Sequence, residues 1–183
     1  MVSVSTPVCD IGRVAPDFIL PGTDGQQHTL TSLAGENGTL VMFICNHCPF
    51  VKAIRERLIV TCRELEAYGV RSVAISANDP SLYPEDSFDY MKAIAQALDF
   101  PFPYLYDETQ AVAKAYGAIC TPDFFGFNND MRLQYRGRFD AAGKRPPTPG
   151  MRRELFEAMK QIAMLGEGPR EQAPSIGCSI KWR

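Results

Sequence analysis

Short apolar runs alternate along this chain with longer segments of helical periodicity. Residues 39–45 (TLVMFIC) are almost continuously apolar, which is typical of a strand buried on both faces. Residues 49–68 place apolar side chains on one stripe opposite arginine and glutamate, and this spacing predicts a helix that Pro49 can begin. Residues 70–77 are predicted to form a second buried strand, so the whole segment predicts a parallel β-α-β unit.

The remaining segments show the same two kinds of pattern. Asp24-Gly25 can form a tight turn, which predicts an N-terminal hairpin of residues 17–20 and 27–30. The other predicted elements are helices over residues 86–98 and 152–165, a short helix from a capping box of Asp107 and Gln110 to Gly117, and two strands over residues 124–127 and 132–139. The segment after residue 165 shows no regular pattern and is expected to be an irregular tail.

This order of elements predicts an α/β fold with a mixed central sheet and helices on both faces. The early β-α-β unit requires parallel strands, and the two late strands form an antiparallel pair. No repeat or linker divides the chain, so we expect one domain over residues 1–183. It would comprise a hairpin extension (1–38), a core (39–165) and a C-terminal tail (166–183).

Charge and hydropathy narrow the functional classes. The chain has 19 basic and 21 acidic residues, a net charge of −2, and both signs are interspersed. No basic face indicates nucleic-acid binding, and no apolar run approaches the roughly 20 residues that span a bilayer. The first residues lack a secretory signal pattern, so a cytoplasmic location is the expectation.

Six cysteines, at positions 9, 45, 48, 62, 120 and 178, carry the candidate chemistry. A structural disulfide framework fits small secreted chains better than this one, and paired cysteines in a reducing compartment are more often catalytic or metal-binding. Cys45-Asn46-His47-Cys48 is such a pair, at the junction of a predicted strand and helix.

Only a thiolate attacks a disulfide, and a helix N-terminus lowers a thiol pKa through its unpaired N–H groups and partial positive charge. We therefore predict that Cys45 attacks and Cys48 resolves. His47, between them, is predicted to stabilise the Cys45 thiolate and to make the oxidised pair a stronger oxidant.

Metal-bound and inert alternatives remain open. A structural zinc site needs about four ligands, but the other cysteines are scattered and the chain has only two histidines, His28 and His47. Copper(I) suits thiolates, and a buried, unreactive pair is the third alternative. The redox interpretation is favoured, with no metal and no cofactor.

Several motifs make this chain resemble the thioredoxin superfamily, in the peroxiredoxin-like branch that includes alkyl hydroperoxide reductases and thiol-specific antioxidant proteins. The motifs are Ala15-Pro16-Asp17-Phe18, Leu33-Ala34-Gly35, the run from Cys45 to Lys52, Ser76-Ala77-Asn78-Asp79, Asp107-Glu108-Thr109, Thr121-Pro122 and the tail from Ile176 to Trp182. The resemblance covers nearly the whole chain.

The resemblance implies a thioredoxin-like fold and a thiol–disulfide oxidoreductase. Its substrates would be protein or small-molecule disulfides, and its redox partner a dithiol or a glutathione-type thiol. A cis proline is expected at Pro122, so that Thr121 and Pro122 offer a backbone edge for an extended substrate. The Cys45–Cys48 pair is expected to be more oxidising than that of thioredoxin itself.

Two departures from the resembled families bear on activity. Thioredoxin carries an acidic residue six positions before its first cysteine, whereas Thr39 stands here. The peroxiredoxin pattern Pro-xxx-Thr-xx-Cys, counted back from Cys48, meets Val41 and Cys45 in place of proline and threonine. Disulfide exchange is therefore favoured over a weak thiol peroxidase or a non-catalytic, redox-responsive binding protein.

Four cysteines lie outside the pair. Cys120, two residues before Pro122, is a candidate third redox thiol or a small buried side chain. Cys178 lies in an apolar tail predicted to fold back over the sheet, as a redox partner, a lid or a purely structural element. Cys9 and Cys62 are interpreted as structural.

Overall fold

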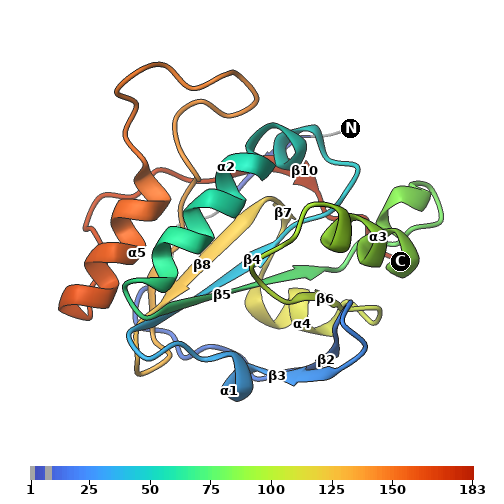
Figure 1. Cartoon of the computed structure of the whole chain (residues 1–183), viewed down its shortest axis with the longest axis horizontal. Coiled ribbons are helices and arrows are strands. Elements are labelled where there is room, and N and C mark those ends of the chain that lie inside the picture. The colour runs from blue at the N-terminus through green and yellow to red at the C-terminus, as the bar shows by residue number, and fades with distance from the viewer. Residues whose placement is uncertain (1–2, 7–9) are drawn as a thin grey trace.

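The central sheet of the computed structural model has the strand order β6-β5-β4-β8-β9 (Figure 1). The structure describes residues 3–6 and 10–183, so the interpretation of Cys9 lies outside the described residues. The five strands are β4 (Gly38–Phe43), β5 (Val70–Ser76), β6 (Tyr104–Tyr106), β8 (Asp123–Phe127) and β9 (Leu133–Tyr135). Strands β4, β5 and β6 are parallel, and β8 and β9 are antiparallel, which confirms the predicted mixed sheet.

Helices cover both faces of this sheet, as predicted. Alternate residues of β4 face two separate cores: Leu40 and Met42 pack with the helices on one face, and Val41 and Phe43 pack with the elements on the other. The first face carries α2 (Pro49–Glu66), α3 (Phe88–Ala97) and α5 (Glu154–Leu165); the second carries α4 (Ala111–Tyr116), α1 (Leu30–Leu33) and the hairpin of β2 (Ile19–Pro21) and β3 (Gln27–Thr29).

A second, three-stranded sheet joins both ends of the described chain. Its order is β1 (Ser3–Ser5), β10 (Ile176–Ser179) and β7 (Cys120–Thr121), and both pairings are antiparallel. The tail is ordered, as predicted, and it is irregular as expected except at Ile176–Ser179, where it forms a strand that was not predicted. Strand β10 lies between β1 and β7, and its four residues are too few to indicate these partners, which come from distant parts of the chain.

Two further local predictions were wrong. Strand β6 was missed because it follows directly after Pro103 and its three residues are too few to show a period. The predicted capping box before α4 does not form, since Gln110 has a left-handed backbone (φ 64°) and makes no side-chain cap. Its amide instead donates to the carbonyls of Ala77 and Lys181, both at 2.8 Å, and so holds the tail against the domain.

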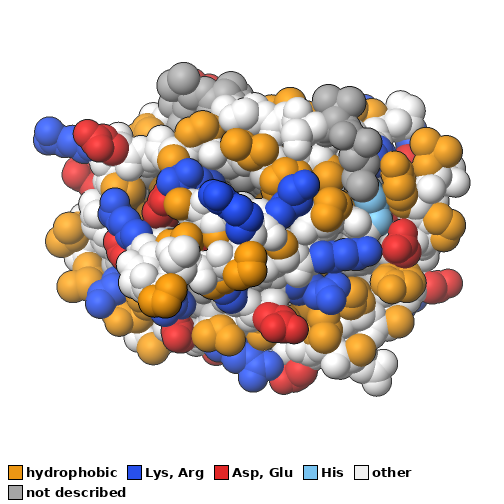
Figure 2. All heavy atoms as spheres, turned by 90° about the horizontal axis from the view of Figure 1, so that it is seen from above, with side chains coloured by type: hydrophobic (Ala, Val, Ile, Leu, Met, Phe, Trp, Pro, Cys, Tyr) orange, Lys and Arg blue, Asp and Glu red, His pale blue; other side chains and the backbone are white. Residues whose placement is uncertain are grey.

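The surface is mixed in character. Figure 2 shows basic, acidic and hydrophobic side chains intermixed on the face drawn. Among the described residues, no helix has both the length and the apolar character needed to cross a membrane.

Candidate active site

The Cys-Asn-His-Cys segment links the end of β4 to the start of α2. Cys48 is the N-cap residue of α2, with extended backbone angles (φ −64°, ψ 123°), and Pro49 begins the helix as predicted. Cys45 lies before it in the connecting loop, and both thiols are buried, with at most 1% of each residue exposed. The strand and the helix therefore hold the two thiols at the edge of the first core.

The backbone at Thr121 and Pro122 lies directly against these thiols. The peptide bond between them is cis, as predicted. Cys45 Sγ is 3.2 Å from the Thr121 hydroxyl, and Cys48 Sγ lies 3.1 Å from the Thr121 carbonyl oxygen, to which it donates when it is protonated. The structure thus brings four of the predicted site residues together.

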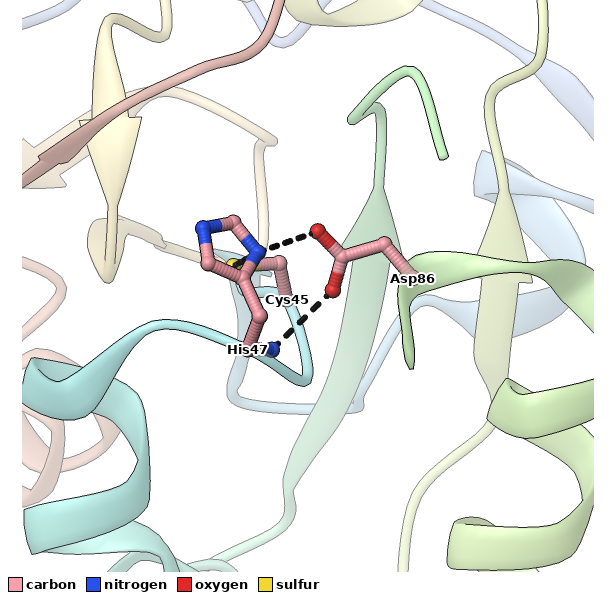
Figure 3. Close-up of side chains that lie close together, drawn as sticks. All are labelled: Cys45, His47 and Asp86. Carbon is pink, nitrogen blue, oxygen red and sulfur yellow. Dashed lines mark hydrogen bonds and ion pairs between the residues drawn. The ribbon is translucent and has the colours of Figure 1, made fainter. Parts of the chain in front are cut away.

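His47 has a partner that the sequence did not indicate. Its Nδ1 lies 2.5 Å from Asp86 Oδ2 and 3.6 Å from Cys45 Sγ. Figure 3 shows the imidazole between these two side chains. The ring stacks on Tyr83, with centroids 3.9 Å apart. Its buried Nε2 has no hydrogen-bond partner within the part of the chain that the structure describes. The same nitrogen, Nδ1, faces both Cys45 and Asp86, so the closest contact of the imidazole is with the carboxylate rather than the thiol.

Asp86 holds the active-site loop from a 3-10 turn, η1 (Pro84–Asp86). Its Oδ1 accepts from the backbone N–H groups of Asn46 (2.8 Å) and His47 (3.1 Å), and its Oδ2 also accepts from Asn78 Nδ2 (2.8 Å). Burial alone would raise the pKa of Asp86, but the hydrogen bonds from His47 and its other donors outweigh burial and lower it. The carboxylate is therefore kept ionised beside the thiols.

The pKa order of the two thiols is the reverse of the prediction. Burial, followed by contact with Cys48 and the charge of Asp86, raises the pKa of Cys45 well above its ordinary value. A hydrogen bond from Cys45 lowers the pKa of Cys48 to about 4, with help from Cys178 and the Val51 backbone and against the effect of burial. The main causes are thus burial at Cys45 and the hydrogen bond from Cys45 at Cys48, and Cys48 rather than Cys45 is the N-cap residue of α2.

This order can be measured by thiolate absorbance. Reduced protein is expected to keep one thiolate as the pH falls, until Cys48 takes up a proton near pH 4. Cys48→Ser should lose that acidic transition, whereas Cys62→Ala, which removes a buried thiol whose pKa burial raises to about 12, should retain it. A first thiolate that appears only near the ordinary value of about 8.5 would contradict this order.

Cys45, His47 and Asp86 also form a group that could supply metal ligands. Their ligand atoms lie within 4.8 Å of one another, and all three residues are buried. They offer three ligands, fewer than the four of a structural zinc site. The hydrogen bond between His47 and Asp86 already occupies the imidazole nitrogen that lies nearest to the thiol.

The other predicted thiols differ in their position relative to the Cys45–Cys48 pair. Cys178 lies at the site, with its Sγ 3.0 Å from Cys48 Sγ. Cys120 is buried on β7, and its Sγ contacts the Pro122 carbonyl at 3.5 Å. Cys62 lies in the core on α2, as predicted.

Sequence reasoning missed Asp86, Asn78 and Tyr83 as site residues. Asp86 was counted only as the start of a helix, although α3 begins two residues later. Asn78 belongs to the Ser-Ala-Asn-Asp motif. The occurrence of that motif together with the tail motif in one chain was the available sign that the two segments meet. The structure joins the two, because the Lys181 N–H donates to Asn78 Oδ1 at 2.9 Å.

Comparison with solved structures defines the class as a thioredoxin-like α/β protein. The exposed lipoprotein thioredoxin Etrx1 of Streptococcus pneumoniae superposes with a TM-score of 0.58 at 19% identity, over 81% of this chain and 98% of its own, which shows the fold alone. The profile of the AhpC/TSA family matches residues 11–138. The chain therefore belongs to the AhpC/TSA family.

Two solved structures are similar over nearly the whole length. An uncharacterized conserved protein from Geobacillus kaustophilus is 43% identical with a TM-score of 0.94, covering 100% of this chain and 97% of that one. A hypothetical protein from Sinorhizobium meliloti 1021 is 40% identical with a TM-score of 0.88, covering 98% and 97%. The fold described above, tail included, is thus shared across the length of these chains.

A curated relative is named for an activity. The thiol-disulfide oxidoreductase ResA of Geobacillus thermodenitrificans is 29% identical over 122 residues, or 63% of this chain. The matched segment spans 62% of the length of that relative.

Proposed function

We propose that this protein is a thiol–disulfide oxidoreductase that uses Cys45 and Cys48 as its dithiol–disulfide couple. The observation that carries the proposal is the ionisable thiol of Cys48, the N-cap residue of α2, which lies against Cys45 and Thr121. The name of the ResA relative supports the reaction class. The substrates are protein or small-molecule disulfides, and a dithiol or glutathione-type thiol completes the cycle.

The reaction follows from the pKa order. The Cys48 thiolate attacks one sulfur of the substrate disulfide, forms a mixed disulfide, and releases the other sulfur as a thiolate that takes up a proton. Cys45 then loses its proton and attacks Cys48 Sγ, which closes the Cys45–Cys48 disulfide and releases the second substrate thiol. Two enzyme thiols are oxidised and one substrate disulfide is reduced. The same steps in reverse oxidise a dithiol.

Positioning of the reacting groups comes from the surrounding buried contacts. The Thr121 hydroxyl, 3.2 Å from Cys45 Sγ, can accept a hydrogen bond from the Cys45 thiol or donate one to the Cys45 thiolate. Asp86 fixes the backbone of Asn46 and His47, and hence the position of the Cys45–Cys48 loop.

The test is reduction of insulin by the protein in the presence of a dithiol, with the reduction potential of the couple measured against glutathione. The protein is expected to accelerate insulin reduction and to show one disulfide in equilibrium with glutathione. A disulfide that titrates without any turnover would overturn the enzyme proposal and favour a redox-responsive binding protein.

A second candidate, a weak thiol peroxidase, is favoured by the low pKa of Cys48 within an AhpC/TSA chain. The Cys48 thiolate would attack hydrogen peroxide to give a sulfenic acid, and Cys45 would then condense with it to form the disulfide and water. Val41 and Cys45 replace the proline and threonine of the peroxiredoxin pattern, so turnover with peroxide should be slower than with disulfides. Parallel assays on both substrates decide between the two.

A further inference from the structure

A third thiol lies in contact with the proposed couple. Cys178, on β10, is the register partner of Thr121 on β7, and its Sγ lies 3.0 Å from Cys48 Sγ. A disulfide bond is about 2 Å long, so a small movement of either side chain would allow a bond. Cys178 is buried, with 2% of its surface exposed, so its sulfur lies in the same enclosed site as the couple.

We propose that Cys178 is a third redox thiol, which takes over the disulfide from Cys45 and so locks the C-terminal strand over the active site. This proposal rests on the proposed function, since it uses the same Cys48 sulfur.

The exchange is balanced within the chain. Cys178 loses its proton and attacks Cys48 Sγ of the Cys45–Cys48 disulfide. The Cys48–Cys178 bond forms, the Cys45–Cys48 bond breaks, and the electron pair stays on Cys45 Sγ, which takes up a proton. One disulfide and one thiol are present before and after, so the step needs no external oxidant or reductant. In the reduced protein, burial raises the pKa of both Cys45 and Cys178 and so favours the protonated form of each.

The backbone around Cys178 gives the exchange a structural consequence. Strand β10 pairs with β7, and so fills the edge that was predicted to receive an extended substrate at Thr121. A substrate disulfide therefore reaches Cys48 only when β10 moves away. A Cys48–Cys178 disulfide would fix β10 in place and keep the site closed, and reduction of that bond would release it.

Close packing at Gly177 shows how tightly β10 fits. A Cβ atom at this position would lie 2.2 Å from the Thr121 carbonyl oxygen and 2.6 Å from its carbon, well inside contact distance. The strand therefore reaches the thiols only because residue 177 has no side chain.

The tail is also connected to the active-site carboxylate. Lys181 donates its backbone N–H to Asn78 Oδ1, and the Asn78 side chain donates from Nδ2 to Asp86 Oδ2 at 2.8 Å. Asp79 N in turn donates to the Lys181 carbonyl at 2.8 Å. Movement of the tail would thus alter a hydrogen-bond donor of Asp86 as well as uncover Cys48.

Disulfide mapping of the full chain tests the proposal directly. Protein oxidised with glutathione disulfide, then alkylated and digested, is expected to yield a peptide pair joined through Cys48 and Cys178. Cys45→Ala should still form that pair, because glutathione disulfide supplies the oxidation and Cys45 is not needed for the bond. Cys178→Ala should lose it and give Cys45–Cys48 alone, whereas Cys120→Ala, which alters the neighbouring thiol on β7, should retain it.

Absence of the Cys48–Cys178 peptides from both wild-type and Cys45→Ala protein would overturn the proposal. Insulin reduction by the same samples tests the proposed function separately. Turnover by the wild type without this disulfide would support the oxidoreductase and overturn the lock. The disulfide without turnover would support the Cys48–Cys178 bond and overturn the oxidoreductase. Because the wild type is itself mapped, the result does not depend on whether a variant folds.

Gly177→Ala tests the lock without removing a thiol. The added methyl group is expected to push β10 from β7, to cause loss of the Cys48–Cys178 disulfide, and to increase alkylation of reduced Cys48. Ile176→Ala, an exposed side chain on the same strand, is the matched control and should behave like wild type. Equal alkylation rates for Gly177→Ala and the control would count against closure by β10.

Discussion

Replacement of Cys48 by serine is expected to lower disulfide exchange on the order of a thousandfold or more, as expected when a covalent nucleophile is lost. A serine hydroxyl does not ionise near neutral pH, whereas the hydrogen bond from Cys45 lowers the pKa of the Cys48 thiol and favours the thiolate. Initial rates of insulin reduction measure the loss.

The Cys45→Ser variant tests which of the two thiols attacks the substrate. Cys45→Ser should retain attack and accumulate a mixed disulfide between Cys48 and the substrate, detectable as added mass, although Cys178 can resolve part of it. Cys62→Ala, a buried cysteine on the same helix, should keep wild-type rates. If Cys48→Ser forms the mixed disulfide and Cys45→Ser does not, the sequence-based roles of the two thiols are restored.

The second large effect is expected from Asp86→Asn. This substitution removes the buried charge that faces His47 and leaves the donors of the active-site loop with a weaker acceptor. Weakening the acceptor of several buried donors typically costs about 1–3 kcal/mol of unfolding free energy. Urea denaturation measures the loss. Asp89→Asn, at an exposed ion pair with Lys92 on α3, is the matched control and should change stability by less than about 0.5 kcal/mol.

The same variant should change the pH dependence of stability. The folded protein lowers the pKa of Asp86 below its usual value of 3.8, so the carboxylate stabilises the fold above that pH. This contribution is lost as the pH falls through the lowered pKa. Wild-type stability should therefore decline on the acid side of 3.8, and the decline should be shallower in Asp86→Asn. An equal loss of stability at acid pH in both proteins would show that Asp86 is not the responsible group.

The sequence predicted those parts of the site that depend on neighbouring residues. The apolar run at 39–45, the helical stripe from Pro49 and the strand at 70–77 define one β-α-β unit, and the Cys-Asn-His-Cys segment lies at its central junction. Each of these elements is long enough to display its own period. Their residues are also buried in the way that the periods require.

The rest depends on contacts between distant segments. Asp86 meets His47 across 39 positions, and Cys178 meets Cys48 across 130, so neither pairing leaves a periodic trace. The expected lowering of the Cys45 pKa was not found, for a related reason. The prediction placed the helix field on Cys45, whereas the chain turns into α2 only at Cys48 and surrounds Cys45 with burial and negative charge.

The position of Trp182 gives the protein a built-in optical reporter. It is the only tryptophan in the chain, it follows Cys178 by four residues, and its partly exposed ring lies under Lys114 Nζ at 5.6 Å. Tryptophan emission responds to the water and charge around the indole, so departure of the tail from α4 would alter both its intensity and its wavelength. Opening of the site could therefore be followed in real time in unlabelled protein, during a single cycle of oxidation and reduction.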